Sequence, residues 1–537
     1  MRRTTLRLAP IVALLVLFVF GGSGVLPLSS SVEAQGKQGG KLVLAARQDI
    51  DTLDPHITNR AATRKILIQF TDTLTVINPK DGKVQPGLAE SWEASSDGKS
   101  YTFRLRKGVK FHDGTPFDAA AVKATFDRIQ EPLGAPGVAR AFLGPYEGAD
   151  VIDSSTVRVR FKQPYAPFPR MAGLSPLAPL SPTAVRKMGQ DFSRRPIGTG
   201  PFMVKEWVTK SHVTLVRNPD YNWASALAAH QGPAYVEEIV WRFVPEATTR
   251  TAILQTGEAN ISEDLSYADV AAFERNRDVR ILRGVPAGTP WTVFPNVQRF
   301  PTNDASVRRA LHHAIRKDAV VRVVFHGQSR PAASLLQPPT PGFAPLATEL
   351  FPYDLARAKK ILDDAGWKPG PDGIRVKDGK RLELLWIFGT NNGYEEMAPL
   401  IQAMAREAGI DIQLREQPRV QMYEAVRKGE HNIGELNWWF PDPSILTTNF
   451  HTSRLHAFNP ARLSDPEIDR LLDQAAGMVD EGQRMELYKK IQRTLLEMGA
   501  GIPLVDQVTI VGVRKEVQGY GFNVVTFPVL YDVRLAK

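Results

Sequence analysis

The chain has 537 residues, and a single hydrophobic core rarely grows beyond about 250–300 residues, so two or more lobes are expected. Its 43% hydrophobic and 23% charged residues are ordinary for a globular protein. The net charge of +10 is spread over the chain without a run of more than two basic residues, which argues against a nucleic-acid-binding stripe. The lack of cysteine excludes disulfides, thiolate metal sites, a cysteine nucleophile and a lipid-modified N-terminal cysteine.

The first 35 residues have the pattern of a cleavable secretory signal peptide. An apolar run at 11–20 is followed by a small-x-small site at 32–34, and a positive start is supplied by Arg2, Arg3 and Arg7. The run is shorter than the roughly 20 apolar residues that span a bilayer. We therefore expect a periplasmic protein that loses residues 1–35. Retention of the segment as an anchor through residue 28 is the weaker alternative.

Alternating apolar residues predict strands in the first third of the chain, at 41–46, 101–105 and 157–161. Asp97-Gly98 marks a hairpin turn before the second strand. Asp118 is placed to cap a helix whose apolar face carries Val122, Phe126 and Ile129. The proline-rich stretch 164–182 is expected to form loops or short helices. The glycine-rich turn at 196–202, PIGTGPF, lacks the GxxxxGK[ST] pattern of a phosphate loop.

Helix caps and periodicity continue through the second half. Asp304, Asp354 and Asp480 each precede a helical pattern, and Ser464 with Glu467 forms a capping box before another helix. A strand at 382–388, a helix at 394–407 and a strand at 410–414 follow in βαβ order, which predicts parallel strands. Final strands are expected at 502–505 and 508–513.

No motif of an enzyme or a metal site stands out. The ten histidines form no metal-ligand spacing, and neither HExxH nor GxSxG occurs. His312 and His313 are adjacent on a helix, so their rings diverge by about 100°. We therefore expect no catalytic residues, no metal and no cofactor.

The stretch ELNWWFPDPSILTTNF at 435–450 is the first candidate for a binding cleft. It places Trp438, Trp439 and Phe440 side by side, and successive side chains of a strand alternate faces, so at least one ring must point away from the main core. Rigid aromatics beside a polar group commonly line small-molecule clefts. The alternative is that two rings are core and one covers a loop.

The segment from Gly87 to Ile129, GLAESWEASSDGKSYTFRLRKGVKFHDGTPFDAAAVKATFDRI, resembles the signature of the extracellular solute-binding proteins of ABC importers in the dipeptide, oligopeptide and nickel class, solute-binding protein family 5. Further motifs extend the resemblance over nearly the whole chain after the signal segment: Leu53-Asp54-Pro55, GTGPF at 198–202, RNPDY at 217–221, VRRAL at 307–311, AGW at 365–367, DPEID at 465–469 and IPL at 502–504.

The resemblance implies an α/β fold of the two-lobed periplasmic binding protein kind, type II-like and of cluster C, with an extra subdomain inserted in lobe I. Lobe I would comprise 36–82, 196–286 and 505–537, the insert 83–195, and lobe II 287–504. The family implies a monomer that closes over a solute and docks on a membrane permease with its ATPase, without catalysis and without nucleic acid.

By this resemblance three segments would contact the solute. They are the loop after Leu53-Asp54-Pro55, the turn after the strand at 382–388, and the aromatic stretch, and their candidate residues are Asn59, Arg60, Ala61, Asn391, Asn392, Tyr394, Asn437, Trp438, Trp439 and Asp442. For the first two segments, a solvated loop or a chain reversal explains the residues equally well.

The aromatic stretch departs from the pattern of peptide binders. Those proteins often carry Asp-aromatic-Pro-Asp-Pro, whose first Asp pairs with the ammonium group of a peptide, and here Trp439 stands in that place. Asp442, followed by Pro443, fits a helix N-cap for 444–450. The expected solute is therefore peptide-like or another small polar molecule without a free N-terminal amine, such as a sugar-like solute or a metal chelate. A periplasmic chaperone or receptor without transport remains an alternative.

Overall fold

The computed structural model describes residues 39–133, 138–390 and 393–536. The predicted signal peptide at 1–35 therefore lies outside the described residues. Among the helices described, none combines the length and apolar character needed to cross a membrane.

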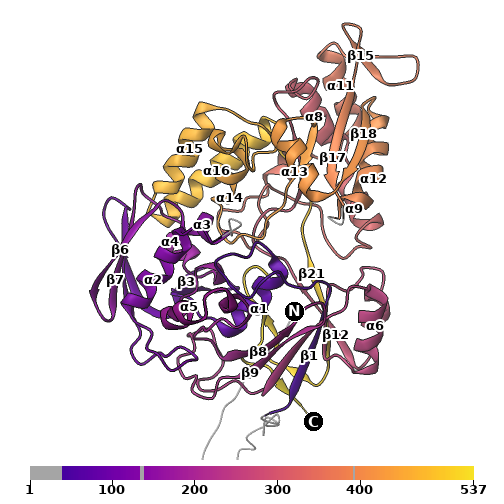
Figure 1. Cartoon of the computed structure of the whole chain (residues 1–537). Helices are drawn as coiled ribbons and strands as arrows, with labels where there is room; N and C mark the ends of the chain where they lie inside the picture. The colour runs from indigo at the N-terminus through magenta and orange to yellow at the C-terminus, as the bar shows by residue number, and fades with distance from the viewer. Residues whose placement is uncertain (1–38, 134–137, 391–392, 537) are drawn as a thin grey trace, which may run out of the picture. The chain divides into compact units, whose positions relative to one another are not determined.

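A seven-stranded sheet is built from distant parts of the chain (Figure 1). Strand β1 confirms the strand predicted at 41–46; it pairs in parallel with β10 and β11, whereas β8 and β9 extend the sheet in antiparallel register. The order is β12 (Val279–Gly284), β21 (Thr509–Arg514), β11 (Ile261–Glu263), β1 (Lys41–Ala46), β10 (Glu238–Phe243), β9 (His212–Arg217) and β8 (Phe202–Val208). Helix α6 (Ala247–Thr256) packs against β1, β11 and β21, α1 (Ala61–Phe70) packs against β8, and α7 (Val270–Glu274) packs against β12.

The region between β3 and β8 forms its own sheet and core. Its strands run in the order β4 (Ala89–Ala94), β5 (Ser100–Leu105), β7 (Thr156–Phe161) and β6 (Tyr146–Asp153). The predicted hairpin joins β4 to β5, and the predicted cap is confirmed, because Asp118 accepts a hydrogen bond from the Ala121 amide at 2.9 Å. The accompanying helices are α2 (Ala119–Gln130), α3 (Val138–Leu143), α4 (Phe168–Met171), η1 (Ser175–Leu177), α5 (Pro182–Met188) and η2 (Gly189–Arg194).

A five-stranded sheet carries the predicted βαβ unit. Strands β17 and β18 are parallel and joined by α12, as expected. The strand order is β18 (Asp411–Gln417), β17 (Glu383–Gly389), β19 (Ile433–Glu435), β13 (Trp291–Pro295) and β20 (Ile502–Val505). The helices around this core are α8 (Ala305–Ala314), α9 (Lys317–Val323), α11 (Leu355–Asp364), α12 (Tyr394–Glu407) and α13 (Arg419–Lys428), and the predicted caps Asp304 and Asp354 are confirmed at α8 and α11.

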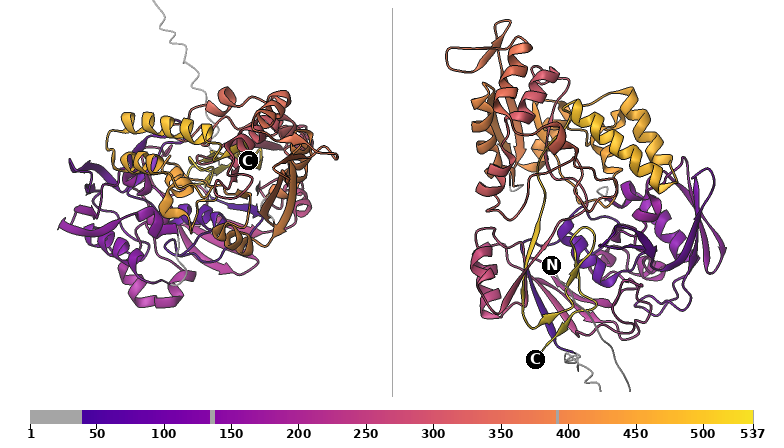
Figure 2. Two further views of the ribbon diagram at one scale, coloured as in Figure 1. Left: turned by 90° about the horizontal axis from the view of Figure 1, so that it is seen from above. Right: turned by 180° about the vertical axis from the view of Figure 1, so that it is seen from behind.

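A helical cluster accompanies the five-stranded sheet, and its longest members α15 and α16 run side by side in both views of Figure 2. It contains α10 (Leu346–Leu350), α14 (Ile445–Phe450), η3 (Thr452–Arg454), α15 (Pro466–Gly477) and α16 (Glu481–Glu497). Asp480 caps α16 as predicted. The capping box at Ser464 is wrong: Asp465 caps α15, accepting from the Glu467 and Ile468 amides at 3.0 Å, because Pro466 takes the first helical position and shifts the cap by one residue.

Short paired strands complete the fold. They are β2 (Thr75–Ile77) with β3 (Val84–Pro86), β14 (Lys368–Pro369) with β15 (Arg375–Lys377) and β16 (Lys380–Arg381), β22 (Val517–Gln518) with β25 (Arg534–Leu535), and β23 (Gly521–Phe522) with β24 (Pro528–Val529).

The chain passes between the seven-stranded and five-stranded sheets at 285–290, from β12 to β13, and at 506–508, from β20 to β21. We call these the two crossing segments. The lobe boundaries predicted at 286/287 and 504/505 fall at or beside them, while the full set of domain limits stays a prediction.

Candidate ligand-binding site

Two of the three predicted segments follow neighbouring parallel strands. The segment 389–394 begins at the end of β17, the aromatic stretch begins at the end of β19, and Trp386 pairs with Ile433 between them. The Gly389 amide donates a hydrogen bond to Glu435 Oε1 at 3.1 Å. Ligands of open α/β sheets commonly bind outside the carboxyl ends of such strands. Asn391 and Asn392 lie outside the described residues.

The three adjacent aromatic rings diverge, as their alternation predicts. Each side chain is partly buried, and each packs against a different part of the chain. The rings of Trp438, Trp439 and Phe440 lie edge-on against those of Phe458, Phe527 and Phe142, with centroid distances of 5.5, 6.0 and 5.3 Å. The stretch is therefore a junction of several cores rather than one continuous aromatic wall.

Gln507, in the second crossing segment, binds two predicted residues at once. Its Oε1 accepts hydrogen bonds from Asn437 Nδ2 at 3.1 Å and from Trp439 Nε1 at 2.8 Å, while its Nε2 donates to the Thr289 carbonyl at 2.6 Å. Gln507 is not among the residues predicted from the sequence. The available signal was a polar side chain between two short apolar strands.

Trp438 is held by its backbone to the first crossing segment. The Thr289 amide donates to the Trp438 carbonyl and the Trp438 amide donates to Thr289 Oγ1, both at 2.9 Å. Gly288 has a φ of 134°, and a Cβ there would lie 1.9 Å from the Trp438 carbonyl oxygen. Only glycine permits this approach.

Gln337 ties the two crossing segments together. Its Nε2 donates to the Pro286 carbonyl at 2.6 Å, and its Oε1 accepts from the Gln507 amide at 2.5 Å. The aromatic stretch and both crossing segments thus form one hydrogen-bonded assembly.

Ala61 and Trp439 come together from opposite ends of the chain. Both pack against one apolar cluster, joined by Ile68 of α1; its buried members are Ile77, Ala287, Val524, Val525 and Phe527. Asn59 and Arg60 are exposed beside this cluster, at the start of α1, where Arg60 occupies the N-cap position. The structure thus brings the first and third predicted segments to one place.

Tyr394 requires a correction, because it is a core residue. Its side chain has no exposed surface, and its hydroxyl donates to the Thr292 carbonyl at 2.9 Å and accepts from the Thr292 amide at 3.1 Å. Burial raises the pKa of this hydroxyl well above its usual value. Its hydroxyl group is therefore already hydrogen-bonded to the backbone of Thr292.

Asp442 also has a structural role. Its Oδ1 accepts a hydrogen bond from the Ser444 amide at 2.9 Å, which is the predicted capping contact, although α14 itself begins only after Ser444. The fully buried carboxylate accepts from Arg484 at 2.6 and 3.0 Å and lies 3.4 Å from Arg170 Nε of α4. Burial favours the neutral acid, but the charges of Arg484 and Arg170 outweigh it and lower the pKa of Asp442. Arg170 also donates to Glu481 at 2.7 Å, so this ion cluster joins the region of β4–β7 to α16.

Comparison with known proteins agrees with this architecture. The profile of "Bacterial extracellular solute-binding proteins, family 5 Middle" matches residues 83–455. The chain belongs to this family. It is therefore a periplasmic-type substrate-binding component of ABC importers, a class that binds small ligands or peptides and works with a permease and ATPase complex.

Similar proteins cover almost all of this solute-binding protein. The glutathione-binding protein GsiB of Salmonella paratyphi A is 30% identical over 509 residues, which is 92% of this chain and 94% of the relative. The periplasmic binding protein DppA of Helicobacter pylori, solved with the peptide STSA, is 26% identical with a TM-score of 0.77, and the match covers 94% of this chain and 100% of that one. NikA of Brucella suis, solved with Fe(III)-EDTA, is 28% identical with a TM-score of 0.81 and coverage of 92% and 100%. These relatives are transporter components rather than enzymes.

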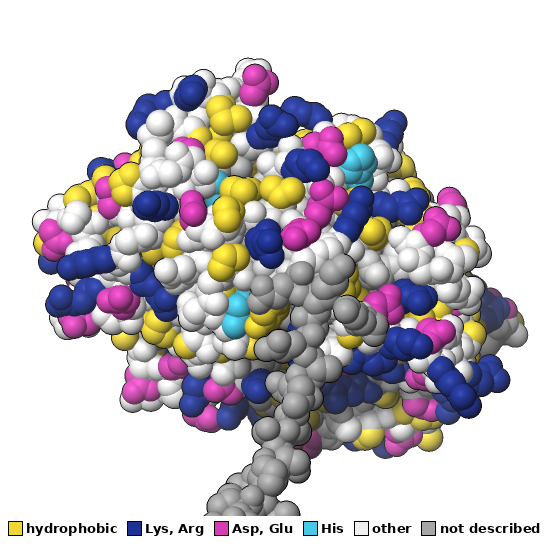
Figure 3. Space-filling model, turned by 90° about the horizontal axis from the view of Figure 1, so that it is seen from below, with side chains coloured by type: hydrophobic (Ala, Val, Ile, Leu, Met, Phe, Trp, Pro, Cys, Tyr) yellow, Lys and Arg dark blue, Asp and Glu magenta, His cyan; other side chains and the backbone are white. Residues whose placement is uncertain are grey.

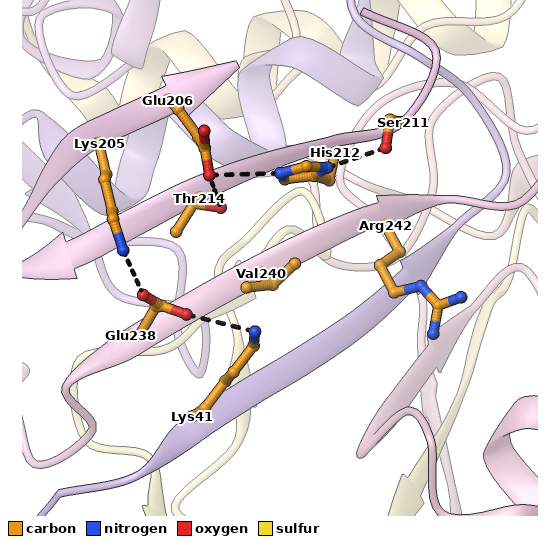
Figure 4. A pocket seen from close by; sticks show the side chains of 9 residues that line it. All are labelled: Lys41, Lys205, Glu206, Ser211, His212, Thr214, Glu238, Val240 and Arg242. Atoms are coloured by element: carbon orange, nitrogen blue, oxygen red, sulfur yellow. Dashed lines mark hydrogen bonds and ion pairs between the residues drawn. The ribbon is translucent and has the colours of Figure 1, made fainter. Parts of the chain in front are cut away.

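A shallow pocket lies away from these residues, on the strands β1, β8, β9 and β10 (Figure 4). It measures about 350 Å³, and most of its charges are paired with one another: Glu238 lies 3.4 Å from Lys41 and 2.9 Å from Lys205, and Glu206 lies 3.4 Å from His212. It contains none of the predicted residues. On the face shown in Figure 3, basic and acidic side chains are likewise intermixed.

A metal site has no support in the part of the chain that the structure describes. No group of three or more His, Cys, Asp or Glu side chains there is arranged to hold a metal ion. The functional candidate is therefore the assembly of α1, the aromatic stretch and the crossing segments.

Proposed function

We propose that this protein captures a peptide-like or other small polar solute between two hinged lobes and delivers it to its permease. It would act as a periplasmic monomer, exported by cleavage of residues 1–35, and would not transform the solute. Binding would shift an equilibrium between open and closed forms, because the solute contacts both lobes only in the closed form.

The observation that carries the proposal is the set of hydrogen bonds around Gln507. This side chain belongs to a crossing segment, where hinge motion must be absorbed, and it also holds Asn437 and Trp439 of the predicted cleft. A solute that displaces or tightens these contacts acts directly on the crossing segments. This gives a physical route from binding to closure.

The solute-contacting surface that we propose consists of the start of α1 and the exposed parts of the aromatic stretch. It keeps the predicted Asn59, Arg60, Ala61, Asn437, Trp438 and Trp439 and omits Tyr394 and Asp442. Trp438 contributes a buried Nε1 that has no hydrogen-bond acceptor among the described residues. An unpaired buried donor of this kind is costly, and a polar atom of a solute would satisfy it.

The solute itself is best sought among small peptide-like molecules and their non-peptide analogues. The glutathione-binding relatives favour a peptide-like solute. The Trp439 side chain, at the place where peptide binders often have an aspartate, favours a solute whose amine is absent or blocked. Modified peptides meet both conditions, whereas sugar-like solutes and metal chelates meet only the second.

Mass spectrometry of the bound solute tests the proposal. Protein purified without denaturation should carry about one small solute per chain, released intact on unfolding. A mixture of ordinary short peptides with free amines would contradict the blocked-amine proposal but not solute capture. Conversion of the solute on prolonged incubation would contradict the absence of catalysis.

A comparison of two variants then tests whether Trp439 contacts the solute. Trp439→Phe removes the indole N–H that Gln507 accepts but keeps a ring against Phe527, so it should weaken solute retention with a small change in melting temperature. Trp207→Phe is the matched control, because Trp207 lies on β8 beneath Arg194, away from the aromatic stretch. Equal solute retention in both variants would contradict a role for Trp439.

A further inference from the structure

Helix α1 begins with an unusual concentration of positive charge. Its first turn carries no acidic residue, and Arg60 at the N-cap supplies no side-chain acceptor for the amides of that turn. Helix N-termini ordinarily favour acidic side chains, because the amides there point outward without partners. Here Arg60 and Arg64, one turn apart, add two positive charges to that end.

Arg64 is the more constrained of the two. It lies on the face of α1 between Ala61 and Ile68, and its guanidinium carbon is 5.5 Å from the centroid of the Phe527 ring. Its Nε is buried without a hydrogen-bond acceptor, and no carboxylate among the described residues forms an ion pair with it. Burial alone lowers the pKa of Arg64 to about 10, with no acidic neighbour to offset it.

The lysine and arginine side chains that are fully buried in the described chain all have partners. The next residue, Lys65, donates to Glu263 at 3.1 Å, and Arg170 and Arg484 share Asp442. Arg308 lacks a carboxylate but donates to three backbone carbonyls, those of Thr302, Asn303 and Met498. Arg64 has neither kind of acceptor, so its environment differs from that of a structural arginine.

Arg64 is partly buried, with its Nε shielded from solvent, and a partly desolvated cation without a counter-charge is less stable than one in an ion pair. Binding of an anion from solution beside Arg64 would offset this desolvation cost. A guanidinium stacked on an aromatic ring keeps its plane fixed and leaves its edge to form paired hydrogen bonds with a carboxylate. The amides of the first turn of α1 add partial positive charge beside it.

We propose that Arg64, assisted by Arg60 and the N-terminus of α1, is the subsite for a carboxylate group of the transported solute. The inference deepens the proposed function and rests on it: Arg64 lies over the ring of Phe527, a member of the apolar cluster that also contacts Trp439, so the carboxylate would be bound beside the aromatic stretch. The solute class that follows is an organic acid or a peptide-like molecule with a free carboxylate.

The test compares Arg64→Met with Lys65→Met and Arg322→Met in thermal-shift measurements. The probes are glutathione, glutamate, succinate and citrate at millimolar concentrations, each with its neutral amide or ester as a control. Arg64→Met removes an uncompensated cation, so its melting temperature without probe should equal or exceed that of the wild type. Lys65→Met strands Glu263 and should lower it by several degrees. Arg322→Met, an exposed i,i+4 partner of Asp318, should change nothing.

The wild type should be stabilised by at least one carboxylate and not by its neutral form. Arg64→Met should weaken that binding by about 10- to 100-fold, the effect of losing charge-assisted hydrogen bonds. Stabilisation by neutral probes alone, or an unchanged affinity in Arg64→Met, would overturn the carboxylate subsite and leave solute capture standing. If no probe binds and no solute is recovered from natively purified protein, both proposals fail.

Discussion

Replacing Asp442 by Asn should strongly destabilise the protein, because it removes the negative charge that two buried arginines share. The carboxylate has no exposed surface, and the side chains of its partners Arg484 and Arg170 are only 5% and 4% exposed. Breaking a buried pair by removing one partner costs about 3–5 kcal/mol, because the remaining charge stays buried. Arg170 retains its bond to Glu481, so most of the loss falls on Arg484.

The assay is denaturant or calorimetric unfolding at neutral pH, with Glu486→Gln as the control. Glu486 is a 71% exposed carboxylate 2.6 Å from Lys489, and exposed pairs of this kind contribute at most about 1 kcal/mol. The double variant Asp442→Leu with Arg484→Met should recover part of the loss, since it removes both charges. A single Asp442→Asn variant as stable as Glu486→Gln would refute the reasoning.

The pH dependence provides a second check on the same carboxylate. The folded pKa of Asp442 is lowered below the ordinary value of 3.8. Its contribution is therefore complete above that ordinary value and is lost as pH falls through the lower folded pKa. The stability difference between wild type and Asp442→Asn should persist down to about pH 4 and shrink only below it.

Three further predictions follow from other contacts. Gly288→Ala places a Cβ 1.9 Å from the Trp438 carbonyl and should cost about 2 kcal/mol or more by strain and loss of the Thr289 pairing; an unchanged melting temperature would contradict this. Burial lowers the pKa of both His56 and His431 to about 4, so each should cost about 3 kcal/mol of stability as pH falls from 6.5 to 4; a flat melting temperature over that range would be the contrary result. Gln507→Met removes three hydrogen bonds at the crossing segment and should weaken solute binding measured by calorimetry, whereas wild-type affinity would argue against that contact as a link to closure.

The sequence patterns correctly predicted those helix caps and strand pairs that depend on interactions between residues close in the sequence. The caps at Asp118, Asp304 and Asp354 and the parallel pairing of β17 with β18 are confirmed, because each depends on residues close in sequence or on one crossover. The capping box at Ser464 failed by one residue, since a proline in the first turn decides between two adjacent cap candidates.

The site was less predictable, because its contacts join distant parts of the chain. The capping contact of Asp442 was predictable, but its ion pairs with Arg170 and Arg484 were not, because these partners cannot be recognised from neighbouring residues. Arg64 occupies an ordinary polar position in a helical pattern, and only the structure shows that no carboxylate among the described residues pairs with it. The divergence of Trp438 and Trp439 was predictable from their adjacency, whereas the ring that each meets was not.

Hinge closure on solute binding tests the central claim most directly. The chain has no cysteine, so Val208→Cys on β8 and Val420→Cys on α13 would give two unique sites for spin labels, at positions 43% and 81% exposed. The first lies on the seven-stranded sheet and the second on a helix packed against the five-stranded sheet. The interspin distance distribution of this pair should change when the solute recovered from the native protein is added. That of a control pair, Val208→Cys with Leu227→Cys, should not. Solute binding that leaves the first distribution unchanged would contradict capture by hinged lobes.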